Sequence, residues 1–387
     1  MKRVAIFRTE LLPLSETFVR DQACALRTWQ PVLVGRCEVE HGLATPRIPR
    51  ELVPQSGSRF ARELRSRLWR PDPALAARLE ALQVDLVHVH FGVDATDIWP
   101  TVKAAGLPMV VSLHGFDINT HRSWWEAGHG GSQRRSYPAR LLKMASQPGV
   151  AFIAVSEAVK RRAVEYGVPA EKVTVIYTGV DTGRFRPAGL PIAGRANRIL
   201  FVGRMVENKA PTLLARACAA IAPHVPGLEL MMIGGGPELE ATRQFALASG
   251  LDIALPGPQP AESVLDALHH AKVLCLPSQQ IASGTGEGLG QVLLEAQACG
   301  VPVVGSTTGG IPEAFQEGST GYLFRSGDQD ELQEALLKVL RSDDERLATL
   351  SAACRNFAVE RFDLARTIVA LERVYDAQVA NDRRRAA

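Results

Sequence analysis

Residues 85–115 read DLVHVHFGVDATDIWPTVKAAGLPMVVSLHG and contain the pattern that decides the fold. Two apolar, β-branched runs, at 85–92 and 108–115, each end in a turn with His and Gly, and a helical pattern lies between them. Strands without polar alternation are buried on both faces, which is typical of a parallel sheet covered by helices. The stretch therefore predicts a strand–helix–strand unit of an α/β protein.

The same rhythm occurs in two series along the chain. Apolar runs of the first series lie at 4–7, 31–35, 85–92, 108–115 and 150–156, and those of the second at 198–203, 228–236, 254–257, 272–278 and 302–306. A Gly-, Pro- and Arg-rich stretch at 178–197 separates the series and is predicted to be a linker. We expect two facing, doubly wound Rossmann-like domains, residues 1–180 and 181–361. Ligands of such sheets bind beyond the carboxyl ends of the strands, so the site is predicted in the interdomain cleft.

Composition agrees with an enzyme of two or three domains, at roughly 150 residues each. With 46% hydrophobic and 22% charged residues among 387, a disordered or collagen-like chain is excluded. No apolar run approaches the length of a membrane span, and the first one breaks at Arg8, so we expect a cytoplasmic protein without a signal peptide. The six cysteines form no CxxC pair, which favours a reduced, metal-free chain.

The densest chemical signal is SGTGEGLGQVLLEAQACGVPVVGSTTGGIPE, residues 283–313. Its Gly-rich loop leads into a helix expected from about Leu289, so the amides of Gly288, Leu289 and Gly290 would face a phosphate. Glu287 precedes that terminus, and Glu295 follows eight residues later, about 12 Å along a helix axis. One of these carboxylates could bind a sugar and the other a ribose. The alternative is that Glu287 only stabilises a helix N-terminus by its charge and that Glu295 is a solvated helix residue.

A second signal is the segment FVGRMVENKAPTLLARA at 201–217. A strand ends at Gly203, and Arg204 and Lys209 follow on the same loop, where two cations could hold a departing diphosphate. Ordinary solvated charges are the alternative. We expect these two cations to neutralise the negative charge of the diphosphate, so that no metal cofactor is needed.

Histidines end two strands of the first series. His114 precedes Gly115 and Asp117 at the end of one strand, where its ring could reach sugar hydroxyls. His88 and His90 share one face of the preceding strand, since alternate residues point the same way. By position His90 could also line the cleft, whereas a structural role is preferred for His88.

Other nucleotide and hydrolase motifs are disfavoured. IGGGPELE at 233–240 is not G-x-G-x-x-G, and the acidic residue that would bind ribose about 20 residues on is absent. The chain also lacks G-x-S-x-G and a Walker lysine.

The motifs GRMVENKA, IGGGPE, LPS, EGLGQVLLEAQACGVPVVGSTTGGIPE and STGYLF, in this order, resemble the retaining glycosyltransferases of family 4, which have the GT-B fold. The resemblance covers nearly the whole chain. It implies that Arg204 and Lys209 bind the donor's diphosphate, that Glu287 contacts the sugar, and that Glu295 binds the ribose. It further implies that Gly288 to Gly290 supply pyrophosphate amides and that His114 lies in the cleft, and Glu313 matches a recurrent family position.

Many members of the family carry paired glycines after the first strand, where this chain has FRTELLPLSETFV, similar to a subgroup that builds bacterial exopolysaccharides. The resemblance implies a hexosyltransferase that moves a sugar from a nucleotide sugar, UDP-linked first and GDP-linked next. The acceptor would be a glycan or a polyprenyl-diphosphate-linked oligosaccharide, and no nucleic acid is expected as a partner. The segment 362–380 would be a terminal helix that returns to the first domain.

Two other classes remain open on these residues. A nucleotide-sugar epimerase would share the fold but need no acceptor groove. A sugar-nucleotide-binding regulator would keep Glu295 without needing Arg204 and Lys209.

The segment RFARELRSRLWR, residues 59–70, predicts a basic amphipathic helix, with five Arg and one Glu. It lies in the basic half of the chain, since residues 1–180 carry 24 Lys and Arg against 17 Asp and Glu. Phe60, Leu64, Leu68 and Trp69 fall near one helical face, a pattern found in helices that rest in a membrane interface. A surface helix that packs this stripe on the sheet is the alternative.

Overall fold

The structure, a computed structural model, describes residues 1–40, 42–45 and 47–386. It divides into two compact units: Met1–Gly179 with Leu364–Ala387, and Val180–Asp363. The boundary falls between Gly179 and Val180, where the sequence indicated 180 and 181, and the chain re-enters unit 1 at Leu364.

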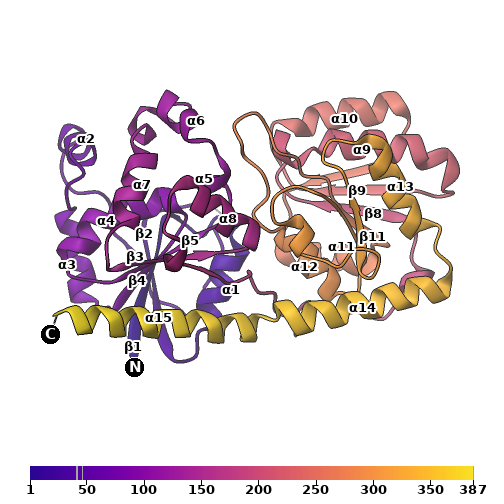
Figure 1. Ribbon diagram of the computed structural model, residues 1–387. Coiled ribbons are helices and arrows are strands. Elements are labelled where there is room, and N and C mark those ends of the chain that lie inside the picture. The colour runs from indigo at the N-terminus through magenta and orange to yellow at the C-terminus, as the bar shows by residue number, and fades with distance from the viewer. Residues whose placement is uncertain (41, 46, 387) are drawn as a thin grey trace. The chain divides into compact units, whose positions relative to one another are not determined.

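Unit 1 is built on a parallel sheet of seven strands in the order β3-β2-β1-β4-β5-β6-β7 (Figure 1). The strands are β1 Lys2–Leu11, β2 Trp29–Glu38, β3 Arg50–Leu52, β4 Leu86–His90, β5 Met109–Leu113, β6 Val150–Ala154 and β7 Val173–Val175. β4 and β5 are buried at every position. This agrees with the continuous apolar runs that predicted a sheet covered on both faces.

Helices cover both faces of this sheet. They are α1 Thr17–Ala25, α2 Arg59–Arg67, α3 Pro73–Ala81, α4 Gly92–Ala104, α5 Phe116–Asn119, α6 Arg122–Ala127, α7 Tyr137–Ala145, α8 Glu157–Tyr166 and α15 Leu364–Ala386. Two 3-10 turns, η1 Ser132–Arg134 and η2 Ala170–Lys172, complete the unit.

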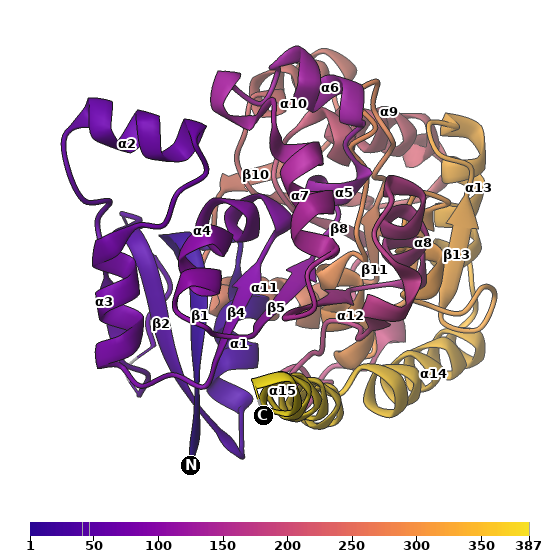
Figure 2. The same ribbon diagram turned by 60° about the vertical axis from the view of Figure 1, so that its left-hand side comes forward.

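Helix α15 is part of unit 1 although it is the last element of the chain (Figure 2). Its residues Ile368, Leu371 and Tyr375 are fully buried in the core of this unit. The Glu372 carboxylate accepts hydrogen bonds from three successive backbone amides that lead into β2, including that of Trp29 at 3.3 Å. The expected helix at 362–380 thus begins two residues later, because Asp363 has a non-helical backbone that separates α14 from α15.

Unit 2 has a parallel sheet of six strands in the order β10-β9-β8-β11-β12-β13. The strands are β8 Arg198–Val202, β9 Glu229–Ile233, β10 Ile253–Gly257, β11 Val273–Leu276, β12 Val303–Ser306 and β13 Gly321–Phe324. The helices are α9 Pro211–Ile221, α10 Glu238–Ser249, α11 Ala261–His270, α12 Gln291–Ala298, α13 Gln329–Leu340 and α14 Asp344–Phe362, and the 3-10 turns are η3 Ile192–Gly194, η4 Glu207–Lys209, η5 Ala222–His224 and η6 Ile311–Glu313.

Both sheets follow the doubly wound order, in which the direction of winding reverses next to the first strand of each unit. The α/β class and the two Rossmann-like units predicted from the sequence are therefore confirmed. Three strands escaped the prediction: β3, β7 and β13, each of three or four residues. β3 and β7 are shorter than the runs from which strands can be read, and β13 begins with Gly321, a residue type that is depleted in strands.

The stretch at 178–197, predicted to be a linker, is attached to unit 2 by side-chain hydrogen bonds. Arg195 is buried, and its guanidinium donates hydrogen bonds to the carbonyls of Leu190, Leu268 and Ala271 at 2.9–3.3 Å. Most of the stretch therefore folds as part of unit 2.

No helix within the described parts of the chain combines the length and apolarity that crossing a lipid bilayer would require.

Candidate functional site

In unit 2 the winding reverses between β8 and β11, so the loops after these strands meet where ligands of doubly wound sheets bind. These loops are tied together. The Gln279 amide donates to the Asn208 carbonyl at 2.8 Å, and the Gln279 side chain donates to the Glu207 carbonyl at 3.2 Å. The candidate residues of both loops are thus held at one place.

Lys209 and Glu287, 78 residues apart in the chain, form an ion pair at this place. Their side chains are only 17% and 13% exposed. The Ser278 hydroxyl, directly after β11, donates a hydrogen bond to the same carboxylate at 3.1 Å. A cation, a carboxylate and a hydroxyl therefore share one half-buried position at the carboxyl end of the sheet.

The surroundings of Glu287 decide its charge. Burial alone would raise the pKa of its carboxyl, but the Lys209 ammonium and hydrogen bonds from Lys209, Ser278 and the Gly288 amide outweigh burial and lower the pKa below its ordinary 4.5. Glu287 is therefore ionised at neutral pH and can accept hydrogen bonds from a polar ligand such as a sugar.

The glycines of IGGGPE allow the backbone of this segment to pack closely against the loop after β8. A Cβ on Gly234 would lie 1.8 Å from the Gly203 carbonyl oxygen, and one on Gly236 would lie 2.3 Å from that of Met205. The Met205 amide donates to the Gly235 carbonyl at 2.8 Å. This segment thus supports the loop that carries Arg204 and Lys209, and that role explains Gly234 and Gly236, two of the three glycines that do not match a dinucleotide motif.

Helix α12 begins later than the sequence indicated. Its first residue is Gln291 rather than Leu289, because Gly290 has a left-handed backbone with φ of 88°. The spacing of 12 Å between Glu287 and Glu295 assumed a continuous helix, and that assumption is wrong because only residues from Gln291 on are helical. Gly288 and Leu289 lie in the turn that precedes the helix.

The remaining predicted donor residues lie at the same end of the unit 2 sheet or on the adjoining helix. Arg204 is exposed on the turn after β8, and its side chain takes no part in the contact between Lys209 and Glu287. Glu295 is half-buried on α12, and Glu313 is half-buried in η6. Next to η6, the Glu287 carbonyl approaches Gly309 so closely that a Cβ there would lie 2.0 Å from the oxygen.

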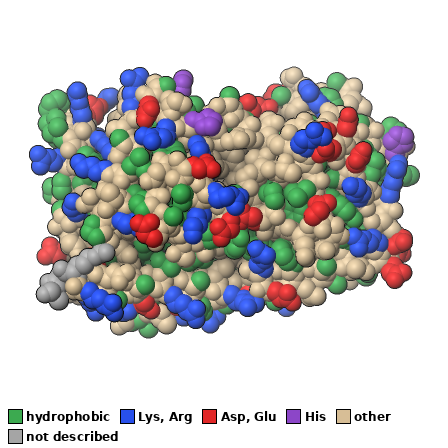
Figure 3. Space-filling model, viewed as in Figure 1, with side chains coloured by type: hydrophobic (Ala, Val, Ile, Leu, Met, Phe, Trp, Pro, Cys, Tyr) green, Lys and Arg blue, Asp and Glu red, His purple; other side chains and the backbone are tan. Residues whose placement is uncertain are grey.

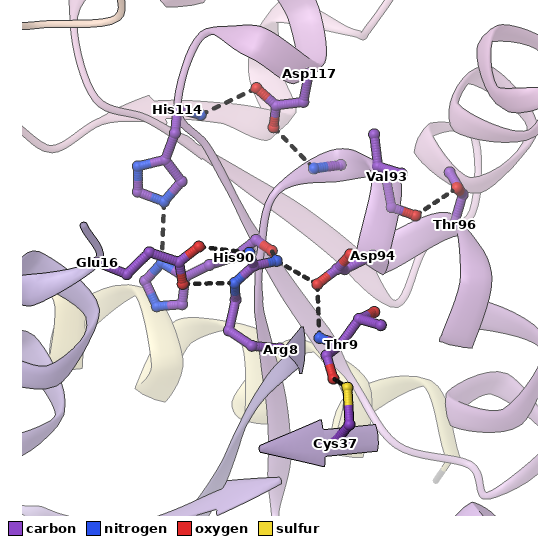
Figure 4. A network of polar contacts seen from close by, with 11 residues as sticks. Arg8, Thr9, Glu16, Cys37, His90, Val93, Asp94, Thr96, His114 and Asp117 are labelled. Carbon is purple, nitrogen blue, oxygen red and sulfur yellow. Dashed lines mark hydrogen bonds and ion pairs between the residues drawn. The ribbon is translucent and has the colours of Figure 1, made fainter. Parts of the chain in front are cut away.

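In unit 1 the winding reverses between β1 and β4. His114 follows β5 directly and therefore lies at the carboxyl end of this sheet (Figure 4). Its Nε2 atom lies 2.9 Å from Nδ1 of His90, and the rings of Phe18 and Phe91 each lie 4.7 Å from its own ring. His88 is fully buried between the Ser112 and Tyr375 hydroxyls, at 2.8 Å and 2.6 Å.

All three imidazoles are neutral at physiological pH. Burial lowers the pKa of His88 to about 3. Burial and then the Arg8 guanidinium lower that of His114 to about 3 as well. Burial, followed by the neighbouring histidines, holds the pKa of His90 well below 6.5. His114 can therefore offer a ligand a neutral donor or acceptor, but no positive charge.

Asp117 fixes the turn that presents His114. Its carboxylate accepts backbone hydrogen bonds from His114 at 3.1 Å, Gly115 at 3.0 Å and Gly92 at 2.8 Å. Burial raises the pKa of Asp117 to about 6, and these amide hydrogen bonds limit the rise. The carboxyl joins the turns after β4 and β5 into one rigid unit.

Arg8, near the end of β1, is the centre of an ion-pair network in unit 1. Its guanidinium pairs with both carboxylate oxygens of Glu16 and with Asp94, as Figure 4 shows. Asp94 also accepts a hydrogen bond from the Thr9 amide at 2.8 Å. These side chains form a polar network at the carboxyl end of β1.

Sequence reasoning missed three contributors to the two sites: Ser278, Arg8 and the structural use of Asp117. Only the LPS motif after an apolar run pointed towards Ser278. Among the residues that the structure describes, no group of three or more His, Cys, Asp or Glu side chains could hold a metal ion.

Two family models match the chain, one to each unit. Residues 16–184 match Glycosyltransferase Family 4, and residues 185–356 match Glycosyl transferases group 1. The division between the two matches follows the division of the structure closely.

Similar proteins agree with these matches. A GDP-mannose-dependent alpha-(1-6)-phosphatidylinositol monomannoside mannosyltransferase of Mycolicibacterium smegmatis is 30% identical over 330 residues, 81% of this chain and 82% of the relative. The amylovoran biosynthesis glycosyltransferase AmsK of Erwinia amylovora is 29% identical over 73% of this chain and 68% of its own.

Among solved structures, HepE of Anabaena in complex with UDP-glucose has a TM-score of 0.79 at 19% identity, covering 97% of this chain and all of its own. This likeness shows the GT-B fold. Together with the two family models and the relative at 30% identity, it establishes that the chain belongs to the family 4 glycosyltransferases.

Proposed function

We propose that the protein is a retaining hexosyltransferase that moves a sugar from a nucleotide sugar to a glycan or a polyprenyl-diphosphate-linked acceptor. The observation that supports it most is the half-buried contact between Lys209 and Glu287 at the carboxyl end of the unit 2 sheet. An ionised carboxylate beside an ammonium fits a ligand with both sugar hydroxyls and a diphosphate.

In this proposal each donor residue has its own task. Lys209 and Arg204 bind the diphosphate and stabilise the negative charge that it gains as the glycosidic bond breaks. Amides of Gly288 to Gly290, in the turn just before α12, bind the same diphosphate. Glu287 binds the transferred sugar, Glu295 binds the ribose, and Glu313 contributes to the donor site.

The acceptor would bind in unit 1, where His114 is neutral and held by Asp117. We propose that the leaving diphosphate takes the proton of the acceptor hydroxyl on the face from which it departs. The sugar then keeps its anomeric configuration without a covalent protein intermediate. No metal ion takes part in the proposal, because the two cations already neutralise the diphosphate.

A UDP-sugar is the first choice of donor and a GDP-sugar the second. The solved complexes of HepE with UDP and UDP-glucose support the first, and the GDP-mannose dependence of the mycobacterial relative supports the second. Surface polysaccharide synthesis, in the cytoplasm at the inner face of the membrane, is the proposed setting, supported by the likeness to the amylovoran enzyme.

A thermal-shift panel of UDP-, GDP- and ADP-sugars tests the donor assignment, since a ligand that binds only the folded state must raise the melting temperature. NMR of the product then reads the anomeric configuration. If no nucleotide sugar stabilises the protein, the proposed function is wrong. Conversion of the bound sugar into its epimer without an acceptor would favour the epimerase instead.

A further inference from the structure

Helix α2 leaves its apolar side uncovered. Phe60, Leu64 and Leu68, at i, i+4 and i+8, are 74%, 44% and 56% exposed, and α2 buries none of its residues. Side chains at this spacing lie on one face of a helix. The alternative, that the stripe packs on the sheet, is therefore wrong, and in Figure 2 α2 projects beyond α3 and α4.

Polar contacts on other sides of α2 attach it to unit 1. The Trp69 indole N–H donates to the Thr96 carbonyl at 2.6 Å, and its ring lies 5.7 Å from the Arg140 guanidinium and 5.5 Å from the Lys143 ammonium. Arg140 donates to the Ser66 carbonyl at 2.5 Å. Trp69 thus serves as an anchor and is not part of the exposed face, contrary to the sequence prediction.

The N-terminal end of α2 is fixed in the same polar way. The Ser58 hydroxyl accepts a hydrogen bond from the Ala61 amide, and the Arg65 guanidinium donates to the Ser56 carbonyl at 2.9 Å. The fold therefore holds this helix without using its apolar side. A contiguous group of exposed apolar side chains is typical of an interaction surface.

Arginines border the apolar face. Arg67 lies beside Phe60 at 100° per residue, and Arg59 lies further round the helix. Arg70 follows Trp69, whose left-handed backbone lies beyond the end of α2, and all three arginines are exposed. The one acidic residue of the segment, Glu63, pairs with Arg59 at 3.0 Å. Figure 3 shows hydrophobic side chains next to Lys and Arg side chains where α2 lies.

We propose that residues 59–70 dock unit 1 on an anionic lipid surface, with Phe60, Leu64 and Leu68 entering the interface and Arg67 and Arg70 binding lipid phosphates. An apolar stripe flanked by arginines complements both layers of such a surface. A second copy of the chain fits less well, since a symmetric contact would bring like charges together. The inference rests on the proposed membrane-presented acceptor and names the surface that reaches it.

Flotation with vesicles of phosphatidylcholine, with and without phosphatidylglycerol, tests the proposal. We expect binding at low salt only when phosphatidylglycerol is present, and a loss of binding as salt is added. A Phe60→Ser/Leu64→Ser/Leu68→Ser variant should lower vesicle affinity about tenfold or more. An Arg67→Glu/Arg70→Glu variant should do so by roughly tenfold as well. Arg65 is left unchanged because it supports the helix.

Leu247→Ser is the matched control, because Leu247 is 78% exposed on α10 of unit 2. The control should float like the unchanged protein. Absence of binding at low salt, or equal binding by the triple Ser variant, would overturn the proposal. A dimer that dissociates in the triple Ser variant, seen by light scattering, would overturn it in favour of a second copy.

Nucleotide binding separates this proposal from the proposed function. The triple Ser variant should keep the melting-temperature increase given by the best nucleotide sugar, because its substitutions lie outside unit 2. If the unchanged protein floats but no nucleotide stabilises it, the donor assignment fails and the lipid surface stands. If nucleotide sugars stabilise the protein but it binds no vesicles, the donor assignment stands and the lipid-surface proposal fails.

Discussion

Nδ1 of His90 and Nε2 of His114 lie 2.9 Å apart, and this contact joins the ends of β4 and β5. The other ring nitrogen of His90, Nε2, is buried without a hydrogen-bond partner in the described parts of the chain. A buried N–H without an acceptor is rarer than a buried lone pair without a donor. His90 therefore donates from Nδ1, and His114 keeps its own proton on Nδ1, where it can donate to a ligand.

Replacing His90 by Ala should lower turnover about tenfold, because the hydrogen bond that sets the tautomer and orientation of His114 is lost. His90→Asn keeps a side-chain N–H near the Nδ1 position and should recover most of the rate. Steady-state kinetics should show the loss in kcat, with nucleotide affinity unchanged by calorimetry. Equal losses for Ala and Asn would make His90 a core residue only.

Lys209→Ala should lower kcat by roughly 10²-fold, as loss of a group that stabilises charge in the transition state does. The substitution also leaves the buried Glu287 carboxylate without its cation, so the melting temperature should fall. Lys103→Ala, at an exposed position in unit 1, is the control. A rate equal to that of the control would remove Lys209 from the donor site.

Glu295→Gln and Glu287→Gln should weaken the binding of different ligands. The first should weaken binding of nucleotide diphosphate and nucleotide sugar alike, through the lost ribose contact. The second should spare the nucleotide diphosphate and weaken only the sugar nucleotide and turnover. Calorimetry with both ligands distinguishes them, and indistinguishable losses would contradict the assigned roles.

Activity should persist in EDTA and gain nothing from magnesium or manganese, since Arg204 and Lys209 carry the charge that a metal would neutralise. Rates measured after dialysis against EDTA, with and without added metal, provide the check. Loss of activity that magnesium restores would show that the diphosphate needs a metal ion.

Stability should fall as the pH drops below about 6.5, where unfolded histidines take up protons that His88, His90 and His114 cannot accept in the fold. Asp97 and Asp117 act in the opposite sense, because burial raises the folded pKa of each to about 6, above the ordinary 3.8. Three imidazoles outweigh two carboxyls, so the melting temperature should decrease from pH 7 to pH 5.

His88→Asn should make that decrease shallower, whereas His224→Asn, at an exposed position, should leave it unchanged. Calorimetric scans across this pH range provide the measurement. A melting temperature that stays constant, or the same slope in all three proteins, would contradict the assignment of buried neutral imidazoles.

Long apolar runs made the fold predictable. β4 and β5 are buried at every position, so their sequences are apolar without the polar alternation of a half-exposed strand. The three-residue β3 and β7 offer no such run. The start of α12 depended on the backbone of Gly290, whose left-handed φ no residue pattern specifies.

For the site, residue types and loop positions indicated Lys209 and Glu287, but not that they touch. Their contact depends on how two loops 78 residues apart are joined by Gln279, which carries no motif. The network of Arg8 with Glu16 and Asp94 was likewise invisible, because it needs the spatial order of β1 and β4.

The position of α15 has a consequence for synthesis on the ribosome. Tyr375, which closes the core of unit 1 and hydrogen-bonds His88, is translated 287 residues after its partner. The strands of unit 1 therefore emerge long before the helix that covers them, and unit 2 is made in the interval. Unit 1 must wait with an incomplete core, exposed to chaperones and proteases, until residues 364–386 leave the exit tunnel.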